Sequence, residues 1–187
     1  MTCRDYVLRT LASVPVNRYV LVLGCEAGDY TAPLLQLGFP VHACHVDPEA
    51  ITDTRTAIAP LMEDPAEATE CVQRCTPALD EYPDSVFDWV IAPHLDRVYP
   101  SSEVDTAFDA MQRIVKPGGW AVLGYAPEPV PAGGEEGAMG WPATPEALIG
   151  RCQQHSLVEA GSPETDTRHD DTQAHLYGLF RRARPST

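Results

Sequence analysis

The chain has 187 residues, a formal net charge of −14 at pH 7 from 27 acidic and 13 basic side chains, and a hydrophobic content of 44%. No stretch approaches the roughly 20 apolar residues of a membrane-spanning helix, and the N-terminal sequence MTCRDYVLRT has no signal-peptide core. The acidic charge repels phosphate backbones, and the longest basic run is Arg181-Arg182. We therefore expect one compact domain over residues 1–187, in a soluble, cytoplasmic protein that binds neither nucleic acid nor a membrane.

The acidic residues are spread along the whole chain, and Lys116 is the only lysine against twelve arginines. This composition predicts a solvated acidic surface and leads to the hypothesis of a salt-loving or GC-rich source organism. The six cysteines include no C-x-x-C pair, so we expect no metal site. We interpret the cysteines in predicted strands as reduced, small core hydrophobes.

Apolar runs alternate with amphipathic stretches along the chain, which is typical of repeated βα units around a mainly parallel sheet. Residues 19–23 are apolar without polar alternation and predict a strand buried on both faces. A helix is expected over residues 29–37, before the second strand at 41–46. The pattern Asp47-Pro48-Glu49 then predicts the start of the next helix, with the Asp47 side chain as its N-cap.

The third and fourth strands are expected over residues 71–75 and 86–92. The helix after them is predicted to begin at a capping box formed by Ser102 and Asp105. Charge, proline and glycine at Lys116-Pro117-Gly118-Gly119 predict its end.

The fifth strand is expected over residues 120–124. Residues 125–143 are rich in proline and glycine and predict a long loop, either a lid over a ligand or a solvated connector. A further helix is expected over 144–152, and two last strands over 157–160 and 175–181. The whole pattern predicts a single α/β domain with a doubly wound sheet.

Ligands of an open parallel sheet lie beyond the carboxyl ends of the strands, where the strand order reverses. This rule directs attention to the turns at residues 24–28, 45–47, 75–77 and 92–94. The first of them, Gly24-Cys25-Glu26-Ala27-Gly28, is a tight glycine turn whose amide groups can hold an anionic group. Its spacing does not match the dinucleotide fingerprint G-x-G-x-x-G, which argues against NAD.

Four segments of the chain together match the pattern of a known family: VLVLGCEAG at 20–28, VDPEAI at 46–51, FDWVIA at 87–92 and RIVKPGGW at 113–120. In order and separation they resemble the class I S-adenosylmethionine-dependent methyltransferases, over nearly the full length of the chain. The resemblance implies a Rossmann-like, mostly parallel sheet of seven strands with an antiparallel last strand. It also implies S-adenosylmethionine as cofactor and, without a large substrate cap, an unidentified small molecule as methyl acceptor.

The resemblance implies that the cofactor binds at the turns named above. The candidate cofactor-binding residues are Gly24, Cys25, Glu26, Ala27, Gly28, His45, Val46, Cys75, Thr76 and Ala92. His94, after the fourth strand, is the candidate catalytic general base, because an imidazole titrates near neutral pH. The polar set from Arg168 to His175 is interpreted as an exposed turn rather than a metal site.

Three positions depart from the family pattern. Val22 stands where an acid is usual, Glu26 replaces the middle glycine, and His45 replaces the carboxylate that holds both ribose hydroxyls. Glu26 is either repelled by the cofactor's carboxylate, paired with its ammonium group, or a surface residue. His45 offers one hydrogen bond to a hydroxyl.

These residues leave three functions open. In the first, the chain is an active methyltransferase. In the second, it is a degenerate member of the family that binds the cofactor weakly or not at all and acts as a binding or assembly partner. A nucleotide-binding oxidoreductase fits the glycine spacing worst. The oligomeric state and the methyl acceptor stay open.

Overall fold

The computed structural model describes residues 3–125, 155–161 and 176–184. Seven strands lie within them: β1 (Val20–Leu23), β2 (Val41–His45), β3 (Val72–Arg74), β4 (Phe87–Ala92), β5 (Val115–Tyr125), β6 (His155–Gly161) and β7 (Leu176–Arg182). They form one sheet in the order β3-β2-β1-β4-β5-β7-β6. Neighbouring strands from β3 to β5 are parallel, and β7 is antiparallel to both β5 and β6. The predicted Rossmann-like sheet with an antiparallel last strand is therefore confirmed.

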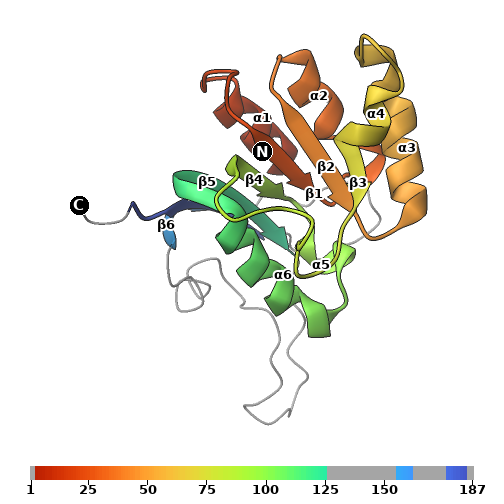
Figure 1. Cartoon of the computed structure of the whole chain (residues 1–187). Helices are drawn as coiled ribbons and strands as arrows, with labels where there is room; N and C mark the ends of the chain where they lie inside the picture. Colours follow the sequence, from red (N-terminus) through yellow and green to blue (C-terminus); the bar gives the residue numbers. More distant parts are fainter. Residues whose placement is uncertain (1–2, 126–154, 162–175, 185–187) are drawn as a thin grey trace.

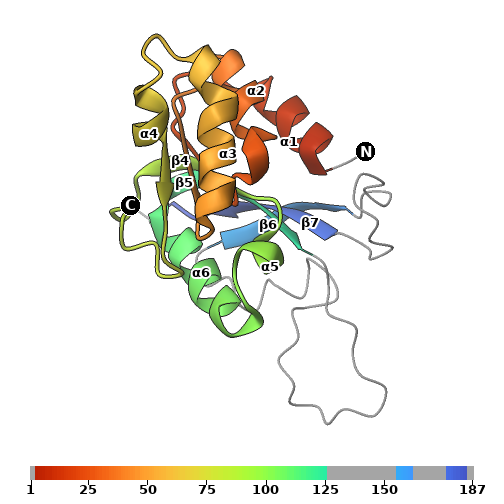
Figure 2. The ribbon, with the colours of Figure 1, turned by 90° about the vertical axis from the view of Figure 1, so that its right-hand side faces the viewer.

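Helices pack on both faces of the sheet (Figure 1). The described helices are α1 (Cys3–Leu11), α2 (Thr31–Gln36), α3 (Pro48–Ile58), α4 (Glu67–Cys71), α5 (Leu95–Val98) and α6 (Ser101–Ile114), with 3₁₀ turns η1 (Glu26–Gly28) and η2 (Ala59–Leu61). α1, α2 and α3 lie on one face and α6 lies on the other (Figure 2). α1 is not among the predicted elements, although its buried positions have the spacing of one helix face.

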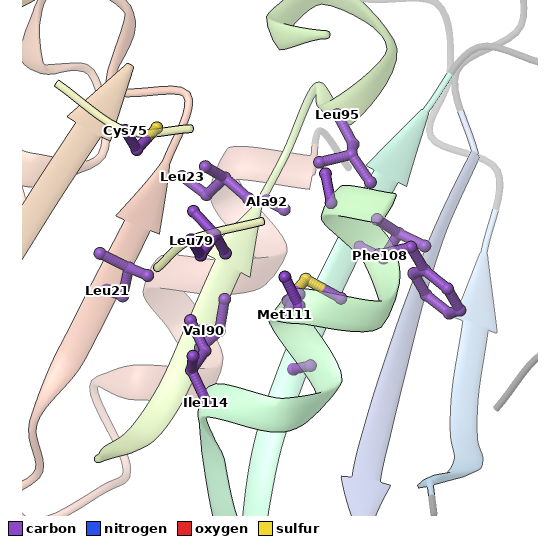
Figure 3. Close-up of a cluster of buried hydrophobic side chains, with 14 of the residues drawn as sticks. Leu21, Leu23, Cys75, Leu79, Val90, Ala92, Leu95, Phe108, Met111 and Ile114 are labelled. Carbon is purple, nitrogen blue, oxygen red and sulfur yellow. The ribbon is translucent and has the colours of Figure 1, made fainter. Parts of the chain in front are cut away.

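The central strand β1 is buried on both faces, because its four apolar residues alternate between two hydrophobic clusters. Leu21 and Leu23 belong to one buried cluster with Leu79, with Val90 of β4 and with apolar residues of α6 (Figure 3). Val20 and Val22 pack on the other face, with residues of α1, α2 and α3. This double burial explains why β1 lacks the polar alternation of a strand with one face in water.

Asp47 caps α3, as the sequence predicts. Its carboxylate accepts the Glu49 N–H at 2.9 Å, and Pro48 occupies the first turn. Asp47→Ala should therefore reduce the free energy of unfolding by about 1 kcal/mol in urea denaturation. Asp53→Ala removes an exposed acid from the same helix and is the control, with an expected change within about 0.5 kcal/mol. Equal losses in the two variants would contradict the capping role.

The start of α6 differs from the prediction. The expected capping box of Ser102 and Asp105 is wrong, because α6 already begins at Ser101 and has no side-chain cap. Pro100 stands at the N-cap with an extended backbone, and its carbonyl accepts the Glu103 N–H at 2.8 Å. The proline backbone therefore sets the start of this helix.

The sequence predicts that residues 116–119 end α6. In the structure α6 ends at Ile114, and residues 116–119 lie inside β5. The register between β4 and β5 shifts here, because the segment bulges out between Val115 and Trp120. Gly118 allows the bulge with a φ of +79°. The third strand is also shorter than the predicted 71–75, because Cys71 still belongs to α4.

Tyr125, the first residue of the predicted loop, belongs to β5. The rest of that loop, the predicted helix at 144–152 with Cys152, and the polar set from Arg168 to His175 lie outside the described residues. In the part of the chain that the structure describes, five cysteines are buried and free of disulfides. None of the helices described is both long and apolar enough to cross a bilayer.

Asp88 joins the amino end of β4 to its neighbours. Its carboxylate accepts the Tyr19 N–H at 3.0 Å and a hydrogen bond from Lys116 Nζ at 2.8 Å, and Arg18 Nη1 lies 3.4 Å away. Burial acts to raise the pKa of Asp88, but these hydrogen bonds and the two neighbouring cations together hold it below its ordinary value. The fold therefore stabilises the ionised carboxylate.

This lowered pKa predicts a pH dependence of stability. The contribution of Asp88 is fully present above the unfolded pKa of about 3.9 and is lost as the pH falls through the lower folded pKa. Lys116→Met should reduce the free energy of unfolding by at most about 1 kcal/mol at neutral pH, as for a partly exposed ion pair. Denaturation at a series of pH values should show this difference shrinking in acid. A difference that is constant with pH would contradict the ionic role of Asp88.

Candidate functional site

The candidate site lies at the carboxyl ends of β1 and β4, which are adjacent and parallel. The chain runs outward from β1 through β2 to β3 on one side and through β4 to β5 on the other, so the strand order reverses between β1 and β4. This is the position where open parallel sheets bind ligands.

The turn after β1 is held tightly between two helices. Gly24 has a φ of +87°, and a Cβ added there would lie 2.6 Å from the Val98 Cγ2 atom of α5. Gly28 has a φ of +85°, and its added Cβ would lie 3.2 Å from the Ala57 Cβ of α3. Ala27, between them, also has a positive φ, of 49°. Two of the three left-handed positions are thus glycines, and this backbone conformation suits glycine best.

Cys25 presents only its backbone to this turn. Its side chain is fully buried, and its Sγ atom lies 3.9 Å from the Ala50 carbonyl oxygen of α3. Thr54 of α3 donates a hydrogen bond to the Cys25 carbonyl at 3.2 Å. Burial raises the pKa of the Cys25 thiol, so it stays protonated at neutral pH. The thiol therefore anchors the turn to α3.

The turn brings Glu26 to His94, which follows β4. The His94 Nε2 atom lies 3.9 Å from a Glu26 carboxylate oxygen, and the two side chains are 10% and 29% exposed. The predicted general base therefore lies beside a carboxylate. The side chain of Ala92, at the end of β4, is buried in the core, so only the Ala92 backbone is available at this edge.

His45, at the end of β2, has a defined protonation state. Its Nδ1 atom accepts the Asp47 N–H at 2.9 Å. Burial lowers the pKa of His45 more than the Asp47 charge raises it, so the ring is neutral at pH 7. An acceptor at Nδ1 requires that the proton is on Nε2, which makes Nε2–H a donor. The following residue, Val46, is half-buried and packs against the core.

Cys75 and Thr76 follow β3 and have different surroundings. The Cys75 Sγ atom lies 3.2 Å from the Tyr99 hydroxyl in the core. Hydrogen bonding from Cys44, and then from Tyr99, lowers the pKa of Cys75 in spite of burial. Thr76 is exposed, and its N–H and hydroxyl donate to the Glu81 carboxylate at 3.0 and 3.3 Å.

Glu81 is a residue of this edge that the sequence analysis does not predict. It lies beyond the turn at 75–77, and only the fold of that segment returns its carboxylate to Thr76. A negative charge shortly after a strand end is the signal that would have pointed to it.

The sequence profile of a family described as "Methyltransferase domain" matches residues 21–123, more than half of the chain. The chain belongs to the methyltransferase domain family. No curated protein matches its sequence.

Many solved structures share the fold of this methyltransferase domain. Magnesium protoporphyrin IX methyltransferase (ChlM) from Synechocystis PCC 6803, solved with bound S-adenosylmethionine, has a TM-score of 0.69 and 16% identity, over 96% of this chain and 78% of that one. The N-methyltransferase NodS from Bradyrhizobium japonicum WM9, in complex with S-adenosylhomocysteine, has a TM-score of 0.66 and 20% identity, over 98% and 86%. The [4+2]-cyclase SpnF has a TM-score of 0.67 and 15% identity, over 96% and 82%.

The methyltransferase domain differs from its family pattern at residues with defined environments. Val22 is fully buried in the cluster against α1, α2 and α3, so an apolar packing residue occupies the position where an acid is usual. Glu26 and His45 are polar and lie at the edge of the sheet. Two of the three departures therefore change the charge and hydrogen bonding of the edge itself.

Proposed function

We propose that this methyltransferase domain binds S-adenosylmethionine at the carboxyl ends of β1 to β4 and transfers its methyl group to a small-molecule acceptor. The observation that carries the proposal is the first turn, where Gly24 and Gly28 have positive φ at the reversal of strand order. The bound ligands of ChlM and NodS, which have the same fold, support it.

The polar groups of this edge fit the parts of the cofactor. The Glu26 carboxylate complements an ammonium group, and the His45 Nε2–H donates to a ribose hydroxyl. The Glu81 carboxylate, beside Thr76, is an acceptor for the adenine amino group. One donor at His45 replaces the two acceptor oxygens that are usual there, so we expect a looser hold on the ribose. When bound, S-adenosylmethionine supplies a methyl group on a positively charged sulfur.

His94 is the group that accepts a proton from the acceptor in this proposal. The carboxylate of Glu26, 3.9 Å from its Nε2 atom, stabilises the imidazolium that forms when a hydroxyl, amine or thiol loses its proton. Alignment of the acceptor and exclusion of water supply the remaining rate acceleration. No further catalytic group is required for methyl transfer.

A transfer assay tests the proposed activity. Radiolabelled S-adenosylmethionine is incubated with a panel of small phenols, amines, thiols and carboxylic acids, and labelled product is expected from at least one of them. His94→Asn should then lower kcat by about 10²–10⁴-fold, the usual contribution of a general base. No product from any acceptor, by a protein that binds the cofactor, would contradict the activity. An unchanged kcat in His94→Asn would contradict the role of His94.

The role of Glu26 predicts a change in cofactor affinity. Glu26→Gln should weaken S-adenosylmethionine binding by roughly tenfold in a calorimetric titration, because a hydrogen bond to a charged group contributes about 1.5 kcal/mol. Glu49→Gln makes the same charge change at an exposed position of α3 and should leave the affinity unaltered. Tighter binding by Glu26→Gly would mean that Glu26 obstructs the cofactor, and would contradict its pairing with the ammonium group.

The second candidate function is a domain that has lost cofactor binding and acts as a binding or assembly partner. The departures at Val22, Glu26 and His45 favour it. SpnF, described as a [4+2]-cyclase, is a fold neighbour whose named reaction is not methyl transfer. Measurement of cofactor binding separates the two candidates, because only the first requires it.

A further inference from the structure

A pocket lies at the opposite end of the sheet from the candidate site. It has a volume of about 320 Å³ and is formed at the amino ends of β1 and β4 and along the bulge of β5. Because β7 is antiparallel to β5, the C-terminal part of β7 lies at this end, where Arg181 stands opposite Trp120 of β5 in the register of the two strands. The residues that give the pocket its character are Arg18, Asp88, Lys116, Trp120, Arg181 and Arg184.

The pocket has a charge opposite to that of the chain. Four cationic side chains and one carboxylate line it, whereas the whole chain has a net charge of −14. The carboxylate, Asp88, is already shared between Lys116 at 2.8 Å and Arg18 at 3.4 Å. Among the residues that the structure describes, no carboxylate forms an ion pair with Arg181 or Arg184. Two guanidinium groups are therefore available to an added anion.

Each of the two arginines packs against another residue of the pocket. The Arg181 guanidinium lies over the Trp120 ring, 5.0 Å from its centroid, and Trp120 is stacked on Trp89 with centroids 5.6 Å apart. Arg184 packs across Gly118, where an added Cβ would lie 2.7 Å from its Nε atom. Ordering of these side chains before an anion arrives lowers the entropic cost of binding.

We infer that this pocket binds a small molecule with two or more phosphate charges. Guanidinium forks match phosphate oxygens in two-bonded geometry, and the lysine adds a point charge. The volume of about 320 Å³ lies at the lower end of the range for small-molecule sites. The acidic remainder of the surface repels a long polyanion such as nucleic acid, so the ligand is small. The site is separate from the proposed cofactor site and does not depend on its activity.

Calorimetric titration of the full chain with pyrophosphate tests the inference, with inorganic phosphate, ATP and citrate as comparisons. We expect saturable binding at one site, tightest for pyrophosphate or ATP and weakened by added salt. A preference for ATP over pyrophosphate would assign the ligand to nucleotides, and the reverse to inorganic or simple organic phosphates. Tighter binding of citrate, or no saturable binding of any of them, would overturn the inference.

Variants locate the binding. Arg181→Gln and Arg184→Gln alter exposed side chains and should each weaken pyrophosphate binding roughly tenfold. Arg9→Gln makes the same charge change on α1, outside the pocket, and is the matched control. Equal weakening in Arg9→Gln would mean that net charge, not the pocket, governs binding. Saturating S-adenosylmethionine should leave the affinity unchanged, and competition would overturn the assignment to this pocket.

Discussion

Gly24→Ala is expected to destabilise the fold by about 2–4 kcal/mol and to weaken S-adenosylmethionine binding at least tenfold. The free-energy loss has two parts, the left-handed backbone at φ +87° and a Cβ 2.6 Å from Val98 Cγ2. Val98 is only 3% exposed and packed in the core, so it cannot move away without disturbing α5. The turn then shifts, and its amide groups are displaced from the positions that the proposed cofactor site requires.

Gly38→Ala separates the two parts of this loss. Gly38 has a nearly identical φ of +89°, but an added Cβ there would meet nothing within 4 Å. This variant should therefore lose only the backbone part, about 1–2 kcal/mol, and should bind the cofactor as the wild type does. Urea denaturation and calorimetric titration measure both quantities. Equal stability losses in the two variants would contradict the contact between Gly24 and α5.

Leu21→Ala is expected to reduce the free energy of unfolding by about 2–5 kcal/mol. Leu21 is 0% exposed on the central strand, in the buried cluster that also contains Leu79, Val90 and residues of α6 (Figure 3). Truncation removes the apolar contacts and leaves a cavity that neighbours on two rigid elements cannot fill. Leu37→Ala makes the same substitution at a position that is 43% exposed, and it should cost less than about 0.5 kcal/mol. A loss below about 1 kcal/mol in Leu21→Ala would contradict the packing of the central strand.

The fold was predictable where the signal was local. β1 is a continuous apolar run and β4 is apolar except at Asp88, because both of their faces are covered by helices. The cap at Asp47 follows from three consecutive residues. By contrast, Ser102 and Asp105 have the residue types of a capping box, but α6 begins before them, at Ser101, with Pro100 at its N-cap. Local patterns predict what an element is more securely than where it begins.

The candidate site was predictable only in its location. The turns at the strand ends follow from the βα pattern, and the ends of β1 and β4 bring Glu26 to His94. The hydrogen bonds from Thr76 to Glu81 and from Asp47 to His45 depend on the conformation of the turns, which residue types alone do not determine. The cationic pocket joins residues from both ends of the chain and has no local signal.

The most direct test of the proposed function is a calorimetric titration of the full chain with S-adenosylmethionine and S-adenosylhomocysteine, at low and at molar salt. The glycine turn and the polar groups of Glu26, His45 and Glu81 predict saturable binding of both, with a dissociation constant in the micromolar range, about −8 kcal/mol. Absence of binding at either salt concentration, by protein that circular dichroism shows to be folded, would contradict the proposal and favour the partner-binding function.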